Sequence, residues 1–288
     1  MRRKWIKRKL LGTKSLRKLL PLDNLSYAAL LTLDSGLSHG SGFRLKYNGY
    51  NFLVTAKHVL YKGNTLRCET LTLTCQSSRS QEPDPLMLQI DMTEAKVFHS
   101  MIDDVAVVLI GTNRKLTDEE MPLKFDTNVN KRPTILEKEK YVEVLNPGNA
   151  HVISVDTEAT RPLSEIKIAN DVYLMGYPMS LRLQNENLFD YSKPLLRKGI
   201  IAGTNPTQNT FIIDCSSYYG NSGGPIIEYG EDDYFRVIGL VSRYIPFVTE
   251  WINPREQITH KENSNSGYTI CVPMNAVYDL IDSHFKQD

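Results

Sequence analysis

Short runs of apolar residues, separated by turn signals, dominate the chain from residue 27 onward. Within many of them apolar and polar positions alternate, which is the period of a half-buried strand. Asn48-Gly49 lies between two such runs and is a strong signal for a two-residue hairpin. The first series of predicted strands covers residues 27–33, 43–47, 50–55, 66–75, 86–90, 95–98 and 105–110.

A second series of strands follows a polar, proline-punctuated stretch at residues 111–165. A connection of this length predicts a linker between two structural units that carries an insertion of its own. Inside it, residues 141–145 and 151–155 are expected to pair as a small hairpin across Pro147-Gly148. The second series of predicted strands covers residues 172–175, 199–202, 211–213, 225–228, 235–242 and 268–272.

Evenly spaced short strands with few helical periods predict an all-β sandwich or barrel rather than βαβ units. Residues 181–196, which carry charged side chains and Pro194, are expected to form an exposed loop. Near the C-terminal end, apolar residues recur at helical spacing, so we expect a short amphipathic helix over 275–285 with Asn275 as its candidate cap.

Composition narrows the class of protein. The 41% apolar and 23% charged content is that of a globular chain and excludes disordered and collagen-like classes. A net charge of +1 gives no overall attraction to nucleic acid. The four cysteines lack the C-x-x-C spacing of a metal site, so they are expected to be reduced and mostly buried, with a Cys68–Cys75 disulfide as the lesser alternative.

Positive charge is concentrated at the N-terminus, where residues 1–18 contain many Lys and Arg and no acidic residue. Leucines lie between these cations, so residues 1–24 could form a basic amphipathic helix that contacts a membrane, nucleic acid or an acidic protein. A disordered basic tail is the equal alternative. Lys14, Arg17 and Lys18 interrupt the apolar core that a secretory signal needs, so a cytoplasmic location is expected.

One turn carries the strongest chemical signal. Ser222 lies among Gly220, Gly223 and Gly224, between two apolar runs, and this pattern indicates a reactive hydroxyl on a tight turn between strands. Glycines permit positive φ angles and let backbone N–H groups converge on one point, as an oxyanion hole requires. An ordinary hairpin loop is the alternative, because Asn, Ser and Gly are common turn residues.

Two other positions could complete a catalytic set. His58 directly follows the buried run 50–55, and Asp103 and Asp104 directly precede the run 105–110. An aspartate at the start of a core strand can hold histidine Nδ1 and stabilise the imidazolium that forms during catalysis. A structural histidine and a solvated carboxylate pair are the alternatives, and alternation does not choose between the two aspartates.

Taken together, these motifs resemble the trypsin-like serine peptidases, and most of all their HtrA branch. The resemblance covers about residues 27–285 and keeps the order His, Asp, Ser. The motifs that carry it are Gly40-Ser41-Gly42-Phe43, Leu53-Val54-Thr55-Ala56-Lys57-His58-Val59, Asp104-Val105-Ala106-Val107, Gly176-Tyr177-Pro178, Lys198-Gly199-Ile200-Ile201 and Gly220-Asn221-Ser222-Gly223-Gly224-Pro225.

The resemblance implies an all-β, chymotrypsin-like fold of two six-stranded antiparallel barrels, at about 25–111 and 166–288, with the site between them. His58 would be the general base and then acid, Asp104 its orienter, and Ser222 the nucleophile. The backbone N–H groups of Gly220 and Ser222 would form the oxyanion hole. A protein or peptide would be the substrate, with no metal or organic cofactor.

Departures from the family pattern concern activation. Asn221 stands where secreted relatives carry an Asp that pairs with a newly cut N-terminal amine, so that route is not expected here. The half-cystines of secreted relatives are absent, and no PDZ domain is expected after the peptidase region. We expect a conditionally active enzyme, with a partner as the candidate activator. A catalytically silent binding protein that acts through the basic arm is the alternative.

For specificity, the resemblance places Ser216 at the floor of the substrate pocket. Ser242, Arg243 and Tyr244 would line the strand that pairs with the substrate backbone. A pocket with a neutral floor, narrowed by neighbouring tyrosines, predicts that the substrate has a small or apolar residue on the acyl side of the cleaved bond.

Overall fold

The computed structural model describes residues 27–36, 38–76, 84–117, 119, 134–148, 154–179, 190, 193–230, 234–253 and 255–285. The basic segment 1–24 and most of the predicted loop 181–196 lie outside the described residues. Within these ranges no helix is long and apolar enough to cross a bilayer.

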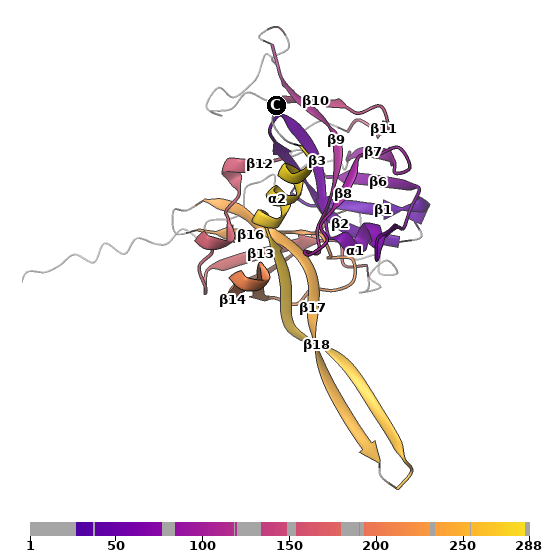
Figure 1. Ribbon diagram of the computed structural model, residues 1–288, viewed down its shortest axis with the longest axis vertical. Helices are drawn as coiled ribbons and strands as arrows, with labels where there is room; N and C mark the ends of the chain where they lie inside the picture. Colours follow the sequence, from indigo (N-terminus) through magenta and orange to yellow (C-terminus); the bar gives the residue numbers. More distant parts are fainter. Residues whose placement is uncertain are drawn as a thin grey trace, which may run out of the picture.

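The N-terminal half forms one ten-stranded sheet that curves into a half-barrel (Figure 1). Its order is β10-β9-β3-β2-β1-β6-β7-β11, with β12 on β2 and β8 on β9. All pairs are antiparallel except the short β12–β2 pair. The strands are β1 (Ala29–Leu33), β2 (Ser38–Tyr47), β3 (Tyr50–Thr55), β6 (Thr70–Cys75), β7 (Leu86–Asp91), β8 (Val97–His99), β9 (Ala106–Lys115), β10 (Thr134–Lys138), β11 (Val142–Asn146) and β12 (Val155–Asp156).

The C-terminal half forms a closed barrel in the order β13-β14-β15-β18-β17-β16, followed by helix α2 (Met274–His284). The predicted all-β, chymotrypsin-like fold is confirmed. The barrel strands are β13 (Asp171–Gly176), β14 (Leu195–Asn205), β15 (Thr210–Asp214), β16 (Pro225–Tyr229), β17 (Phe235–Asn253) and β18 (Ile258–Pro273). Smaller elements are α1 (Lys57–Leu60), the β4–β5 pair (Tyr61–Lys62, Thr65–Leu66), and the 3-10 turns η2 (Asp34–Gly36), η3 (Thr157–Ala159), η4 (Leu163–Glu165) and η7 (Pro206–Gln208).

The first unit differs from the predicted six-stranded barrel because the polar stretch after it supplies strands. β10 pairs with the end of β9, which continues past residue 110. β11 pairs with β7, and Val155 of the second predicted arm pairs with Leu45 of β2. Residues 151–153, which the predicted hairpin needs, lie outside the described residues. Val142 explains the pairing of β11 with β7, since it buries its side chain in the first core.

The burial pattern accounts for the strands that the sequence predicted well. β1 alternates buried and half-buried positions, and residues 52–55 of β3 are buried on both faces. The hairpin prediction is confirmed: Asn48 and Gly49 have φ angles of 50° and 80° between β2 and β3.

All four cysteines are free and buried, so the Cys68–Cys75 disulfide is excluded.

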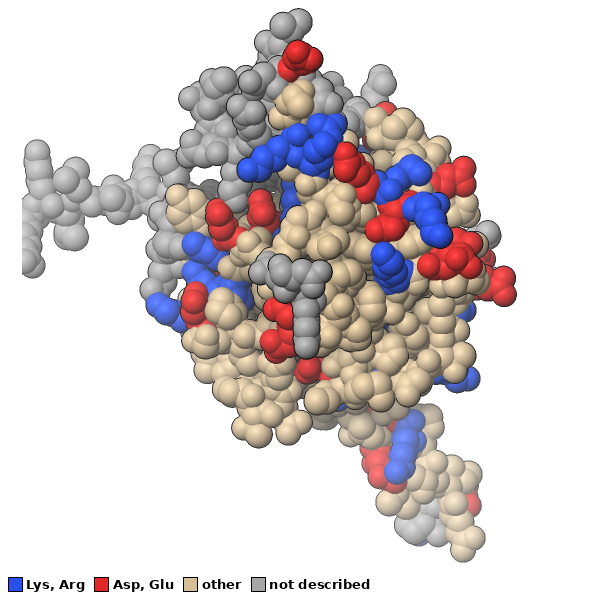
Figure 2. Space-filling view, turned by 45° about the horizontal axis from the view of Figure 1, so that its top comes forward, with Lys and Arg blue, Asp and Glu red and all other residues tan. Residues whose placement is uncertain are grey.

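The largest surprise is a long two-stranded ribbon, the outer part of β17 and β18, defined here as residues 246–265. It projects from the body (Figure 1), and its register continues to Asn253↔Ile258. Large apolar side chains on it are exposed, such as Phe247 at 61% and Ile252 at 67%. In Figure 2 the body next to the ribbon is mostly uncharged, and acidic and basic side chains lie intermixed on the upper part of the body.

Helix α2 confirms the predicted C-terminal helix but not its cap. Pro273 occupies the N-cap position. Asn275 instead accepts a hydrogen bond on Oδ1 from the backbone N–H of Leu163, at 2.7 Å. The asparagine therefore ties the linker to the helix.

Candidate active site

His58 lies on the single turn of α1, directly after the buried strand β3. The neighbouring Lys57 anchors this turn by donating from Nζ to the carbonyl of Ser100 at 3.0 Å. Arg67 donates to the carbonyl of His58 at 2.9 Å. The His58 side chain is 49% exposed, so one end of the ring is open to solvent.

Asp104 holds the inner end of that ring. Its Oδ2 lies 2.8 Å from His58 Nδ1 and accepts from the hydroxyl of Ser242 at 2.6 Å, while its Oδ1 accepts from the His58 backbone N–H at 3.1 Å. Burial by itself would raise the pKa of Asp104, but the hydrogen bonds from His58 and Ser242 and the charge of His58 outweigh it, so the pKa lies below its ordinary value. Asp103 faces elsewhere, toward Asn209.

The glycine turn after β15 carries Ser222. Gly220 has a φ of 99°, and a Cβ there would collide with the backbone carbonyl of Tyr177, so only glycine fits. Asn221 N–H donates to the carbonyl of Tyr218, and Gly224 N–H donates to the carbonyl of Asn221, both at 2.9 Å. These bonds fix the loop on either side of the serine.

Ser41, on β2, fastens this turn to the first sheet. Its hydroxyl donates to the carbonyl of Gly220 at 2.6 Å and accepts from the N–H of Tyr177 at 2.9 Å. Its backbone N–H donates to the carbonyl of Ser222 at 2.9 Å. The turn that bears Ser222 is therefore positioned by both halves of the molecule.

The Ser222 hydroxyl donates to the carbonyl of Ser242 at 3.3 Å. This is a long bond for an O–H donor and is correspondingly weak. In the part of the chain that the structure describes, the backbone N–H groups of Gly220 and Ser222 donate to no acceptor. Two amides beside a serine hydroxyl are thus free to bind an oxygen atom.

A cavity of about 370 Å³ brings these groups together and is called here the catalytic cavity. Ser217, and not Ser216, belongs to its lining, so the cavity gives no support to Ser216 as the pocket floor. Ser216 lies next to Gly267, at 3.9 Å from the position that a Cβ would take there. The lining residues are Ser38, His39, His58, Val59, Arg67, Ser217, Tyr218, Tyr219, Gly220, Ser222, Ser242, Arg243 and Tyr244.

A family model for the trypsin-like peptidase domain matches residues 40–240, which include the histidine, the aspartate and the serine. The chain belongs to the trypsin-like peptidase family. No curated protein matches it significantly.

Solved structures give weaker likenesses. A serine endoprotease from Yersinia pestis shares 15% sequence identity at a TM-score of 0.45, and the match covers 90% of this chain and 62% of the endoprotease chain. The HtrA-type protease AlgW with tripeptide shares 15% sequence identity at a TM-score of 0.48, and the match covers 91% of this chain and 61% of AlgW. The protease Anisep from Arthrobacter nicotinovorans shares 14% identity at a TM-score of 0.48, and the match covers 89% of this chain and 93% of Anisep. The chain thus spans about three fifths of the length of the first two. TM-scores below 0.5 carry no argument about function.

Sequence reasoning missed two side chains of this trypsin-like peptidase. Ser242 was expected to offer its backbone to a substrate, yet its hydroxyl also binds Asp104. Ser41 entered only as part of a glycine-rich motif, yet it holds the turn that bears Ser222. No periodicity marks either serine, because each acts through contacts distant in the sequence.

Proposed function

We propose that the chain is a serine endopeptidase that cleaves peptide bonds through an acyl-enzyme. The observation that carries the proposal is the arrangement around one cavity: the Asp104-bound imidazole of His58, the Ser222 hydroxyl, and the two unpaired N–H groups. Each of these groups has one role in acyl transfer.

In the proposed reaction, Ser222 Oγ attacks the carbonyl carbon of the scissile bond while His58 Nε2 accepts the hydroxyl proton. The negative charge moves to the carbonyl oxygen, where the N–H groups of Gly220 and Ser222 stabilise it. His58 then donates the proton to the leaving amine as the C–N bond breaks. Water then attacks the acyl carbon while His58 Nε2 accepts its proton, the bond from the acyl carbon to Ser222 Oγ breaks, and His58 returns the proton to that oxygen as the acid leaves. Asp104 orients the ring and stabilises the imidazolium throughout.

The bond between Ser222 and the Ser242 carbonyl suggests how substrate prepares the nucleophile. A peptide backbone pairing with the strand at Ser242 would offer an N–H to that carbonyl. The Ser222 hydroxyl, released from its long bond, would then turn to His58. Hydrogen bonds of catalytic groups often tighten only when substrate is bound.

Labelling with a fluorophosphonate probe tests the proposal. We expect labelling of the wild type, none of Ser222→Ala, and a loss of about three orders of magnitude or more in His58→Ala. Ser283→Ala, on the outer end of α2, is the control and should label like the wild type. A wild type that stays unlabelled across pH and with peptide substrates present contradicts the proposal and favours the silent binding protein.

A further inference from the structure

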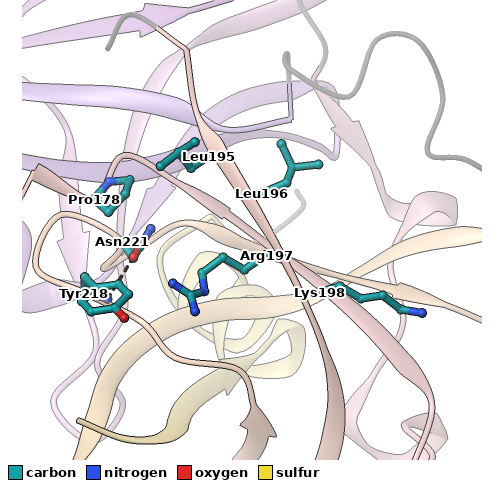
Figure 3. A pocket seen from close by; sticks show the side chains of 7 residues that line it. All are labelled: Pro178, Leu195, Leu196, Arg197, Lys198, Tyr218 and Asn221. Atoms are coloured by element: carbon teal, nitrogen blue, oxygen red, sulfur yellow. Dashed lines mark hydrogen bonds between the residues drawn. The ribbon is translucent and has the colours of Figure 1, made fainter. Parts of the chain in front are cut away.

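A second cavity, of about 410 Å³, lies behind the nucleophile turn (Figure 3) and is called here the rear pocket. Tyr218 lines both the rear pocket and the catalytic cavity, whereas Asn221 lines the rear pocket and Ser222 the catalytic cavity. The turn is therefore a wall shared by the two cavities. The rear pocket is lined by Pro178, Leu195, Leu196, Arg197, Lys198, Tyr218 and Asn221.

The side chain of Asn221 leaves one strong donor unused in this wall. The residue is 1% exposed, and its Oδ1 accepts from the N–H of Tyr218 at 2.9 Å, which fixes which end of the amide is nitrogen. Among the described residues, Asn221 Nδ2 has no hydrogen-bond acceptor, and Figure 3 shows it turned away from Tyr218. A ligand oxygen bound in the rear pocket would give this N–H the acceptor that it lacks.

Arg197 supplies a positive charge to the rear pocket near Asn221. Its guanidinium lies 5.1 Å from the ring centroid of Tyr218. Figure 3 shows Arg197 and Leu195 pointing toward Asn221, while Lys198, the next residue on β14, points away. Lys198 is paired with Asp171 at 2.6 Å.

The chemistry of the rear pocket selects its ligand. A guanidinium from β14 and an amide N–H from the turn line the same pocket, and together they match the two oxygens of a carboxylate. Pro178 and Leu195 offer an apolar surface beside them. We propose that the rear pocket binds a carboxylate carried on an apolar chain, with one oxygen on Asn221 Nδ2 and the other on Arg197. Such a ligand would hold the turn from behind, and this effect on catalysis rests on the proposed peptidase function.

Binding is measured by calorimetry on Ser222→Ala protein, which separates the site from catalysis. The probes are acetyl-Leu-Leu with a free carboxylate, the same dipeptide as its C-terminal amide, and hexanoate. We expect the acid to bind about ten-fold or more tightly than the amide. Binding of hexanoate as well would identify any aliphatic acid as the ligand, whereas binding of the dipeptide acid alone would identify a peptide terminus; both results support the site.

Substitutions of basic residues locate the binding. Arg197→Gln should lose at least about ten-fold in affinity and Arg197→Lys should lose less. Lys96→Gln removes a positive charge that lines neither cavity, so this control should bind like the parent protein. Arg197 does not line the catalytic cavity, so these variants also exclude binding of the acid as a reaction product. Equal affinity for acid and amide, or unchanged binding in a folded Arg197→Gln protein, overturns the proposal.

A coupling readout completes the experiment. In the wild type, the dipeptide acid is expected to raise the rate at which Ser222 is labelled by a fluorophosphonate, and Arg197→Gln should abolish this increase. Binding with no increase in labelling overturns the coupling of the two cavities. A wild type that is never labelled contradicts the peptidase proposal, while the binding measured on Ser222→Ala still decides the carboxylate site.

Discussion

At the scale of single residues, the Asp104 carboxylate is bound by three donors from His58 and Ser242, and its pKa is lowered. A lowered folded-state pKa contributes stability that is fully present above the unfolded value, about 3.9, and is lost as the pH falls through the folded value. Asp104→Asn lacks this contribution.

We therefore expect the difference in unfolding free energy, wild type minus Asp104→Asn, to shrink as the pH falls from about 5 to about 2. Urea unfolding of both proteins at several pH values in this range measures it. A difference that grows or stays constant as the pH falls would show that the native carboxylate is not held in its charged form.

Gly220 allows a sharper test of backbone geometry, because Gly49 provides a matched control. Both have positive φ, of 99° and 80°, but a Cβ on Gly49 meets no atom within 4 Å, whereas one on Gly220 collides with the chain at Tyr177. Gly49→Ala should lower the free energy of unfolding by about 1–2 kcal/mol, which is the cost of holding a residue with a Cβ in the left-handed backbone conformation.

We expect Gly220→Ala to cost clearly more than Gly49→Ala and also to slow fluorophosphonate labelling of Ser222, because the amide at position 220 must move. Urea unfolding and labelling rates measure both effects. Equal losses of stability in the two variants, with labelling intact, would mean that the turn tolerates a side chain.

At the scale of elements, the ribbon of residues 246–265 is separable from the barrel. None of its residues belongs to either buried apolar cluster among the described residues. Its strands hold together by their own register and by local contacts, such as the stack of Trp251 on His260 and the Glu250–Lys261 pair at 3.4 Å. It therefore adds little to the stability of the body.

Replacing residues 247–264 by Asn-Gly joins Pro246 and Asn265, which are paired across the ribbon. We expect the thermal midpoint to change by no more than about 4 °C. Ile281→Ala in α2 is the comparison, because that side chain is only 1% exposed. This substitution should lower the free energy of unfolding by about 2–5 kcal/mol and lower the thermal midpoint accordingly. A shortened protein as destabilised as Ile281→Ala would show that the ribbon supports the core.

The same contrast explains which elements the sequence could predict. Strands such as β3 and β9 lie over a core, so burial imposes a pattern that can be recognised in the sequence. The ribbon has no core beneath it and β10 is set by pairing to β9, so no local pattern marks their ends. The strand predicted at 141–145 agrees with β11 to within one residue, but its pairing with β7, which lies far away in the sequence, was not predicted. At the site, His58 and Asp104 were identifiable at strand ends, but the contacts of Ser41 and Ser242 depend on the assembled fold.

At the scale of the whole molecule, the two β units are joined at the site and again at the C-terminus. Ser41 on β2 binds the turn of Gly220 and Ser222 from the second unit. On the other side, α2 packs both against β17 and β18 of the second barrel, which it follows in the chain, and against β8 and β9 of the first sheet. Phe285, just after the helix, contacts the rings of Phe52 and Phe98.

This last contact has a consequence for biosynthesis. The first sheet is complete in sequence by residue 156, yet Phe285, which covers the rings of Phe52 and Phe98, is synthesised only after the whole second barrel. At about 5–20 residues per second, the nascent sheet keeps this surface exposed for several seconds or more while the second barrel is made. Closure of the molecule thus waits until the second barrel and the helix after it have been made, and until then this patch is where chaperones or misfolded neighbours would bind.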